Sequence, residues 1–441
     1  MEGNTFLPKV KEQYEELPYP PRDPELERSR LIHKIGDNLI ILNHHCFRGA
    51  RDFRTGFRVL VAGGGTGDST IYLAEQLRGL NGEVVYLDLS AAAMGIAMER
   101  ARIRGLTNIR WLNESIMRIP ELGLGKFDYI NCTGVLHHLE STEAGLATLA
   151  GVLEDTGVIL LMLYGKYGRR SVYDMQELLR QYLPADLDVA GRIRMTRELL
   201  DCLPASNSFI RDLPVWRSEI SREGFGDAGL YDLLLHSQDR CFDVPELYRL
   251  ADSAELEFLA FVDRAASYDP FSCLAEGPVS AHLHELERPA RETLAEQMVA
   301  DLSAHEFYLG RRGAGTSREA RLDDEANTLV MMGAMHGKHE EIGAGLTPGR
   351  TLSFSGRGGD ITITGTPVNR ILLAHMDGRT PLSRIYKRVQ KNLPGVSQAQ
   401  VRAELRALYH AMHPRGYLYL LRQGSYGTRV PDYTQLQPFL G

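Results

Sequence analysis

A run of glycines early in the chain is the feature best suited to binding a ligand. It follows a short apolar segment and contains Gly63, Gly64, Gly65 and Gly67. Glycines let the backbone turn sharply and let a ligand lie against it without an intervening side chain. Asp88 ends the next apolar segment, where a carboxylate can accept both hydroxyls of a ribose. Together these features predict a nucleoside-cofactor site at the carboxyl edge of a parallel sheet.

Strands and helices alternate around these residues, as in a parallel sheet with right-handed crossovers. We predict strands near residues 57–62, 83–88, 108–112, 127–132 and 157–164. The helices that separate most of them lie near 68–78, 91–104 and 142–154. A helix that begins at Asp68 and Ser69 would turn its free N–H groups toward the glycine run. The predicted fold class is therefore α/β with a Rossmann-like sheet.

The spacing of the glycines distinguishes two kinds of cofactor. A dinucleotide site requires G-x-G-x-x-G, whereas Gly63-x-Gly65-x-Gly67 is followed directly by Asp68. A carboxylate where a pyrophosphate would lie argues against NAD or FAD. The pattern instead resembles the class I S-adenosylmethionine-dependent methyltransferases.

Further motifs extend this resemblance over roughly residues 14–176. They are P-Y-P, V-A-G-G-G-T-G, V-V-Y-L-D-L-S, G-V-L-H-H-L and L-Y-G-K-Y-G-R. Together they resemble a bacterial methyltransferase group that includes enzymes fused to tetratricopeptide repeats and outer-membrane-protein lysine methyltransferases. One position departs from the family pattern, because Val61 stands where many relatives have an acidic residue.

The resemblance implies S-adenosylmethionine as the cofactor, with the glycine loop on its methionine part, Asp88 on its ribose and the segment from Glu114 on its adenine. The predicted cofactor-binding residues are Ala62, Gly63, Gly64, Gly65, Gly67, Asp68, Ser69, Asp88, Leu89, Glu114, Ser115, Ile116, Asn131 and Thr133. The candidate catalytic residues are Tyr19, His137 and Tyr164, with His138 as the other member of a histidine pair. The candidate substrate residues are Tyr14, Tyr167, Arg169 and Tyr173.

Five segments are expected along the chain. They are an N-terminal arm and helix (1–56), the methyltransferase core (57–176), a helical cap (177–245), completion of the core sheet with a linker (246–345) and a C-terminal module (346–441). Within the fourth segment, residues 279–310 are interpreted as helical and 327–333 as the antiparallel last strand of the sheet. The proline-rich arm either packs onto the domain or, with the cap, closes the pocket, and Tyr19 is then expected nearer the methyl group than Tyr14.

The C-terminal module resembles a small winged-helix domain of the α+β type. Its strands and helices are expected near 351–354, 361–364, 366–376, 381–392, 397–412 and 417–421. A basic helix face, formed by Arg384, Lys387, Arg388 and Lys391, raises the possibility of DNA binding. The net charge of −7 favours an interaction or dimerisation module instead.

Composition sets the remaining expectations. The chain has 441 residues, 43% of them hydrophobic, and its five cysteines contain no C-x-x-C pair. This suits a reducing cytoplasm and predicts no metal site. No segment is apolar enough to cross a membrane. We therefore expect a cytoplasmic protein without a nucleic-acid or membrane partner, and a homodimer is left open.

The functional hypothesis is an enzyme that transfers a methyl group from S-adenosylmethionine by in-line displacement, with alignment and exclusion of water as the main tasks of the protein. A small-molecule acceptor is placed first. The alternatives are a protein (lysine) methyltransferase and a non-catalytic protein that senses the cofactor.

Overall fold

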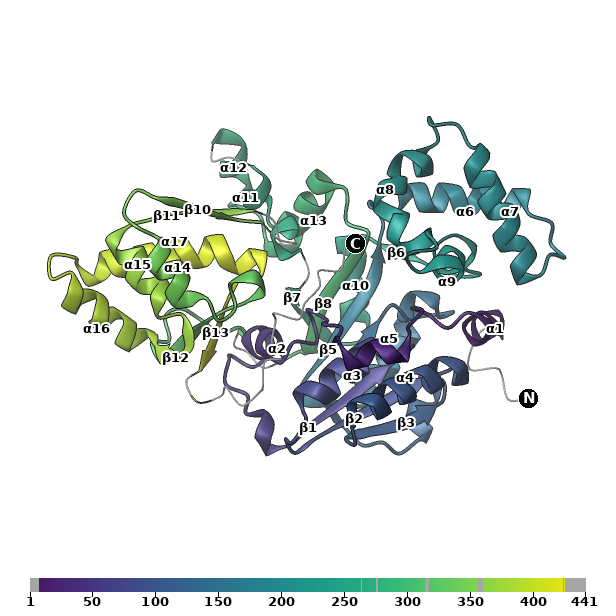
Figure 1. The fold of residues 1–441 in the computed structure, drawn as a ribbon, viewed down its shortest axis with the longest axis horizontal. Coiled ribbons are helices and arrows are strands. Elements are labelled where there is room, and N and C mark those ends of the chain that lie inside the picture. Colours follow the sequence, from purple (N-terminus) through teal and green to yellow (C-terminus); the bar gives the residue numbers. More distant parts are fainter. Residues whose placement is uncertain are drawn as a thin grey trace.

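The computed structural model describes residues 8–262, 264–274, 277–313, 317–355, 360–422 and 424. A central sheet flanked by helices lies between a helical cap and a C-terminal lobe (Figure 1). None of the helices in these residues is both long and apolar enough to cross a membrane.

The central sheet has the strand order β3-β2-β1-β4-β5-β8-β7, and a short strand β6 also pairs with β5. Its strands are β1 (Phe57–Ala62), β2 (Gly82–Asp88), β3 (Ile109–Asn113), β4 (Phe127–Thr133), β5 (Leu153–Gly165), β6 (Cys241–Phe242), β7 (Leu256–Phe261) and β8 (Ala304–Arg311). Only β8 runs antiparallel to its neighbours. The crossover helices between the first five strands include α3 (Asp68–Gln76), α4 (Ala91–Arg104) and α5 (Thr142–Gly151). The predicted Rossmann-like sheet is thus confirmed.

The antiparallel strand was predicted at the wrong place. It is β8, inside the stretch 279–310 that was interpreted as helical, and not the segment 327–333. Helices α12 (Pro278–Leu283) and α13 (Arg288–Val299) do occupy the first part of that stretch. The apolar runs in β8 and β9 (Asn327–Met331) have similar lengths, so periodicity could not distinguish them. β9 belongs instead to the C-terminal lobe.

Apolar side chains cover both faces of the central sheet. On one face Leu60, Phe127 and Ile159 pack with α5 and with α10 (Val244–Ser253). On the other face Val59, Val61 and Tyr129 pack against α2 (Leu39–Cys46), every residue of which is buried. This packing fixes the carboxyl ends of β1, β2, β4 and β5, where the predicted site residues lie.

The cap is formed by α6 (Arg170–Tyr182), α7 (Val189–Cys202), α8 (Ser208–Ile220) and α9 (Gly226–Leu230), followed by a single π-helical turn over 231–235. It has its own apolar core around Phe209, Trp216 and Leu233. Figure 1 shows it beyond the carboxyl ends of the strands, close to α1 (Pro8–Glu16) of the N-terminal arm.

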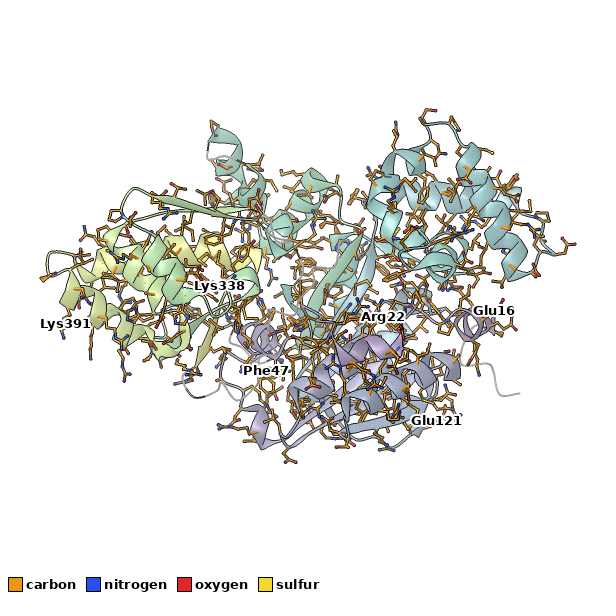
Figure 2. The ribbon with its side chains drawn as sticks, in the orientation of Figure 1. Glu16, Arg22, Phe47, Glu121, Lys338 and Lys391 are labelled. Atoms are coloured by element: carbon orange, nitrogen blue, oxygen red, sulfur yellow. The ribbon has the colours of Figure 1, made fainter. Side chains whose placement is uncertain are left out.

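The C-terminal lobe combines a three-stranded sheet, β12-β9-β13, with a hairpin, β10-β11, and four helices. Beyond β9 its elements are α14 (His339–Gly345), β10 (Thr351–Phe354), β11 (Ile361–Thr364), α15 (Pro367–Ala374), β12 (Asp377–Pro381), α16 (Leu382–Asn392), α17 (Gln398–Met412) and β13 (Leu418–Arg422). Its core begins at Ala320, upstream of the expected boundary at residue 346. The basic face of α16 is exposed, and Figure 2 shows Lys391 at the outer end of the lobe. The likeness to a winged helix stays a prediction.

Candidate functional site

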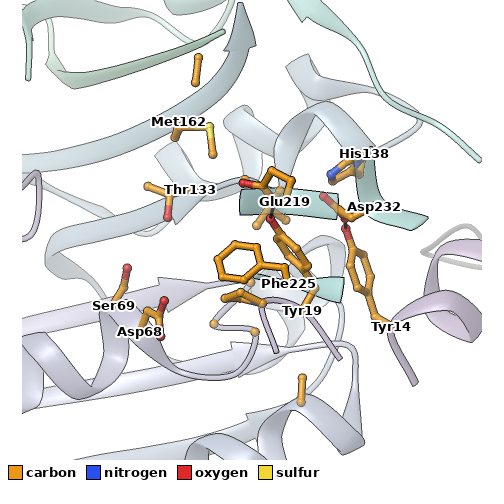
Figure 3. Close-up of a pocket in the computed structure, with 18 of the residues that line it drawn as sticks. Tyr14, Tyr19, Asp68, Ser69, Thr133, His138, Met162, Glu219, Phe225 and Asp232 are labelled. Atoms are coloured by element: carbon orange, nitrogen blue, oxygen red, sulfur yellow. Dashed lines mark hydrogen bonds between the residues drawn. The ribbon is translucent and has the colours of Figure 1, made fainter. Parts of the chain in front are cut away.

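A cavity of about 2090 Å³ lies at the carboxyl edge of the central sheet. Its wall combines four parts of the chain: the N-terminal arm, the glycine loop, the strand ends and the cap. Figure 3 shows side chains from these parts, including Tyr14, Ser69, Thr133 and Asp232, around one space. Most of the predicted site residues line this wall. Those that do not line it are Ala62, Gly67, Asn131, His137, Tyr167 and Tyr173.

The glycine loop needs glycine for two different reasons. Gly63, Gly65 and Gly67 have φ values of 84°, 50° and 100°, in the left-handed region that favours glycine. A β-carbon on Gly65 would also lie 2.8 Å from the carbonyl oxygen of Tyr19. The hydroxyl of Thr66 donates a 2.6 Å hydrogen bond to the carbonyl oxygen of Pro20. The P-Y-P arm therefore packs directly on the glycine loop.

Asp88 is held in place at the end of β2 by backbone N–H groups. Its Oδ2 accepts a 2.7 Å hydrogen bond from Gly65, and its Oδ1 accepts one of 2.8 Å from Ser90. Burial raises the pKa of the Asp88 carboxyl, against the opposing effect of these N–H groups. The segment from Glu114 to Met117 follows β3 along the same edge of the cavity. Asp88 and this segment thus line the same cavity, and their role in binding the nucleoside stays a prediction.

Asp68, at the start of α3, forms ion pairs with two arginines. Its carboxylate lies 2.6 Å from Arg22 Nη2 and 2.8 Å from Arg100 Nη1. Burial alone would raise the pKa of Asp68, but the two guanidinium groups hold it well below its usual range. Arg100 also pairs with Glu27 at 2.6 Å. Asp68, a predicted cofactor-binding residue, is therefore also part of a buried ion-pair network that joins the N-terminal arm to α3 and α4.

Asn131 lies beneath the cavity wall rather than on it. Its amide Nδ2 donates hydrogen bonds of 2.7 Å to Asp37 and 3.3 Å to the hydroxyl of Ser69. Thr133, two residues further along β4, donates its hydroxyl hydrogen to Asn131 at 3.2 Å and does line the cavity. Asn131 thus positions the hydroxyls of Ser69 and Thr133, two residues that line the cavity.

A cluster of tyrosine, aspartate and histidine occupies the end of the cavity under the cap. The hydroxyls of Tyr14 and Tyr164 donate hydrogen bonds of 2.9 and 3.3 Å to the two carboxylate oxygens of Asp232. His138 stacks on His236 with ring centroids 3.9 Å apart. Figure 3 shows Tyr14 pointing toward Asp232 and His138. We call these five residues the Asp232 cluster.

The hydrogen-bond partners of the two histidines assign their protons. The N–H of Gln238 donates to Nδ1 of His236, so that the proton of the neutral ring is on Nε2, 3.3 Å from the Tyr14 hydroxyl. Nδ1 of His138 lies 2.9 Å from the carbonyl oxygen of Gln238 and must donate to it, which leaves its Nε2 as an acceptor. Burial lowers the pKa of both rings and raises that of Asp232.

A second carboxylate, that of Glu219, contacts the N-terminal arm next to the Asp232 cluster. The Tyr19 hydroxyl donates a 2.9 Å hydrogen bond to Glu219 on α8. The Tyr19 ring also meets Phe225 edge-on at 5.7 Å, and burial raises the pKa of Glu219. Arm and cap therefore close this end of the cavity together.

The remaining predicted residues differ in position. Arg169 lines the cavity, with its guanidinium 3.5 Å from the centroid of the Tyr164 ring, and its Nε and Nη2 have no hydrogen-bond partner within the described residues. His137 lies behind the wall, 3.9 Å from the Tyr164 ring centroid. Its neighbour His138 is the histidine that reaches the cavity. Tyr167 is half-buried near Gln297, and Tyr173 is half-buried with its hydroxyl beside Cys241, so neither lines the cavity.

Sequence reasoning missed the acidic side chains of the cap. Glu219 and Asp232 lie in helical segments without a recognisable motif, and the arm residues that contact them precede them by about 200 residues. Phe225, in the turn before α9, was missed as well. Arg22 was also missed, although its position beside the P-Y-P motif was a usable signal because the arm was expected to cover the cofactor edge.

Comparisons with known proteins agree with this geometry. Residues 60–159 match the family described as "Methyltransferase domain". An uncharacterized protein of Synechococcus is 32% identical over 260 residues, which are 58% of this chain and 60% of that protein. The ubiquinone/menaquinone biosynthesis C-methyltransferase UbiE of Idiomarina loihiensis is 29% identical over 114 residues, 26% of this chain and 45% of that enzyme. The chain thus spans less than two thirds of both relatives.

A solved structure matches most of the chain. PKMT2 from Rickettsia typhi superposes with a TM-score of 0.64, covering 92% of this chain and 78% of that one at 16% identity. At this identity the match shows a shared fold. With the strand order, the matched residues 60–159 are a methyltransferase domain of the class I type, whose cofactor is S-adenosylmethionine.

The residues present fit this cofactor. The glycine loop leaves bare backbone facing the cavity, and Asp88 presents a carboxylate that backbone N–H groups already orient. Glu114, Ser115 and Ile116, which are predicted to contact the adenine, line the same cavity.

Proposed function

We propose that this protein transfers the methyl group of S-adenosylmethionine to an amine nitrogen held by the Asp232 cluster and Glu219. The observation that carries the proposal is the pair of hydrogen bonds from Tyr14 and Tyr164 to Asp232, because they place a buried carboxylate among aromatic rings at the end of the cofactor cavity. When bound, the cofactor supplies an electrophilic methyl group on a sulfonium. The chain's own residues align the acceptor and exclude water.

Two carboxylates and three tyrosines suit a cationic amine in particular. An ammonium group is attracted by aromatic faces and donates hydrogen bonds to carboxylates and phenol oxygens. Asp232 and Glu219 both have raised pKa values because they are buried, so either can take up a proton at a higher pH than an exposed carboxyl would. An amine must lose a proton before it attacks carbon, and these groups are in place to receive it.

The dimensions of the cavity favour a lysine side chain as the acceptor. A volume of about 2090 Å³ exceeds the roughly 300–1,000 Å³ of ordinary small-molecule pockets. Additional acids, among them Glu140 and Glu223, line it as well. A large cavity with these acids in its wall supports a polypeptide that inserts one lysine, which was the alternative in the sequence analysis. A small-molecule amine, in line with the acceptor placed first there, is the second candidate and would need the same carboxylates.

The test uses S-adenosylmethionine with an isotopically labelled methyl group. The full chain is incubated with a lysine-containing peptide library and, separately, with free lysine and polyamines, and mass spectrometry locates the label. We expect label on the lysine Nζ of peptides. Label on free amines alone would select the second candidate. Label only on oxygen, sulfur or carbon would overturn the amine proposal.

A further inference from the structure

A group of three histidines and one glutamate lies outside the lining of the cofactor cavity, where the C-terminal lobe meets the core. His44 and His45 come from α2, Glu319 from the connection before β9, and His413 from the turn after α17. One nitrogen or oxygen atom from each of the four lies within 4.8 Å of all the others. We call these four residues the His-Glu cluster. We infer that they bind a structural zinc ion.

The three distances from Glu319 to the histidines match the spacing of ligands in a tetrahedral site. Glu319 Oε1 lies 3.4 Å from His44 Nε2, 3.4 Å from His45 Nδ1 and 3.4 Å from His413 Nε2. Ligands about 2.0–2.1 Å from a tetrahedral zinc are about 3.3–3.4 Å apart. Charge-assisted hydrogen bonds between nitrogen and a carboxylate are shorter, about 2.7–2.9 Å. The spacing therefore matches ligands around a shared ion better than direct hydrogen bonds.

The protonation of the histidines points the same way. Nδ1 of His413 lies 2.9 Å from the carbonyl oxygen of Leu418 and must donate to it, so its Nε2 presents a lone pair to Glu319. A ring nitrogen whose lone pair faces a carboxylate oxygen repels it unless a cation lies between them, and His413 Nε2 faces Glu319 in this way. Nδ1 of His45 lies 3.4 Å from the same oxygen and has no hydrogen-bond partner within the described residues. A backbone carbonyl behind a ligating histidine is also the usual outer partner of a zinc ligand.

The position of the His-Glu cluster suggests what the ion does. α2 packs on the central sheet through Leu42 and Ile40, and the same apolar layer includes Tyr419 and Leu421 of β13. Figure 1 shows α2 between the sheet and the C-terminal lobe, and Figure 2 labels Phe47, the residue directly after it. Zinc here would join α2, the connection and the C-terminal lobe at one point. The exposed side chain of Glu319 gives the ion a way in from solvent.

The test measures metal binding by the full chain. The metal-free protein is titrated with zinc, monitored by competition with a chromophoric chelator, and separately with cobalt(II), whose visible absorption is intense in tetrahedral sites. We expect one tight site per chain, an intense visible band and an increase in melting temperature with zinc. Glu319→Gln and His413→Gln should weaken zinc binding at least about tenfold. The matched controls, Glu340→Gln and His410→Gln, change exposed residues of the same lobe and should bind zinc like the wild type.

Three results would overturn the inference. In the first, the wild-type chain does not bind zinc tightly and its cobalt complex lacks the spectrum of a tetrahedral site. This result can be interpreted without any variant. Another is equal zinc affinity in Glu319→Gln, His413→Gln and the controls. The third is tight zinc binding that leaves the melting temperature unchanged, because a structural ion must stabilise the folded state. Each outcome is independent of methyl transfer.

Discussion

Tyr14 of the N-terminal arm and Asp232 of the cap, 218 residues apart in sequence, are joined by a hydrogen bond of 2.9 Å. Tyr19 and Glu219 repeat this relationship at 2.9 Å over 200 residues. The arm and the cap are therefore linked to each other across the end of the cofactor cavity, and the predictions below depend on this closure.

Replacing Tyr19 tests whether the arm contributes to catalysis. Tyr19→Phe removes only the hydroxyl that binds Glu219, so turnover should fall while affinity for S-adenosylhomocysteine stays close to that of the wild type. Tyr19→Ala also removes the aromatic ring that packs against Phe225. Because this opens the cavity, both turnover and affinity for S-adenosylhomocysteine should fall. Steady-state kinetics and calorimetry measure the two quantities. Wild-type activity in Tyr19→Ala would reduce the arm to simple packing.

Asp88→Asn should weaken binding of S-adenosylhomocysteine by about 2–3 kcal/mol, because a charge-assisted contact with the ribose becomes a neutral one. The asparagine keeps an oxygen for the N–H groups of Gly65 or Ser90, so the loop should stay folded. Asp201→Asn, on the exposed surface of α7, is the control. Unchanged affinity in calorimetry would remove Asp88 from the cofactor site.

The contact between the glycine loop and the arm can be tested with one methyl group. Gly65→Ala would place a β-carbon 2.8 Å from the Tyr19 carbonyl oxygen, so the arm must move and cofactor affinity should fall. Gly79→Ala is a matched control, because Gly79 also has a positive φ, 73°, but a β-carbon there meets nothing within 4 Å. If both variants bind the cofactor equally well, the close contact between Gly65 and the carbonyl oxygen of Tyr19 does not affect cofactor binding.

Arg22→Gln should destabilise the fold by about 1–3 kcal/mol, because Asp68 keeps only Arg100 as a charged partner. The pKa of Asp68 is depressed in the folded state, so its contribution is complete above the unfolded value of about 4 and is lost as the pH falls through the folded value. The difference in free energy of unfolding between wild type and variant should therefore narrow below about pH 4. Urea unfolding at several pH values measures it, and a constant difference would contradict the assignment.

The sequence predicted best those site residues whose positions are determined by their neighbours in the chain. The glycine loop and Asp88 follow β1 and β2 as predicted, because short apolar runs and turn residues determine both locally. The antiparallel strand β8 was missed because its apolar run follows helical segments without a clear boundary, and its place in the sheet depends on pairing with β5 and β7. Long-range pairing of this kind leaves little signal in the local sequence.

The acceptor end of the cavity was predicted only in part. Tyr14, Tyr19 and Tyr164 were named, but their partners Asp232 and Glu219 were not, since only folding of the cap brings them to the arm. His137 was chosen over His138, and the backbone turn after β4 decides which of two adjacent rings faces the cavity. The four residues of the His-Glu cluster are equally invisible in sequence, because their spacing matches no known metal motif.

The most direct measurement of the proposed function is single-turnover methyl transfer to a lysine peptide by Asp232→Asn. The asparagine oxygen can accept from one of the Tyr14 and Tyr164 hydroxyls, and its NH2 group can donate to the oxygen of the other, but the variant lacks the charge proposed to bind the amine and receive its proton. We predict a rate about 10²–10⁴-fold below wild type, with unchanged affinity for S-adenosylhomocysteine. Asp227→Asn, an exposed aspartate of the same cap, should retain the wild-type rate. A wild-type rate in Asp232→Asn would contradict the account.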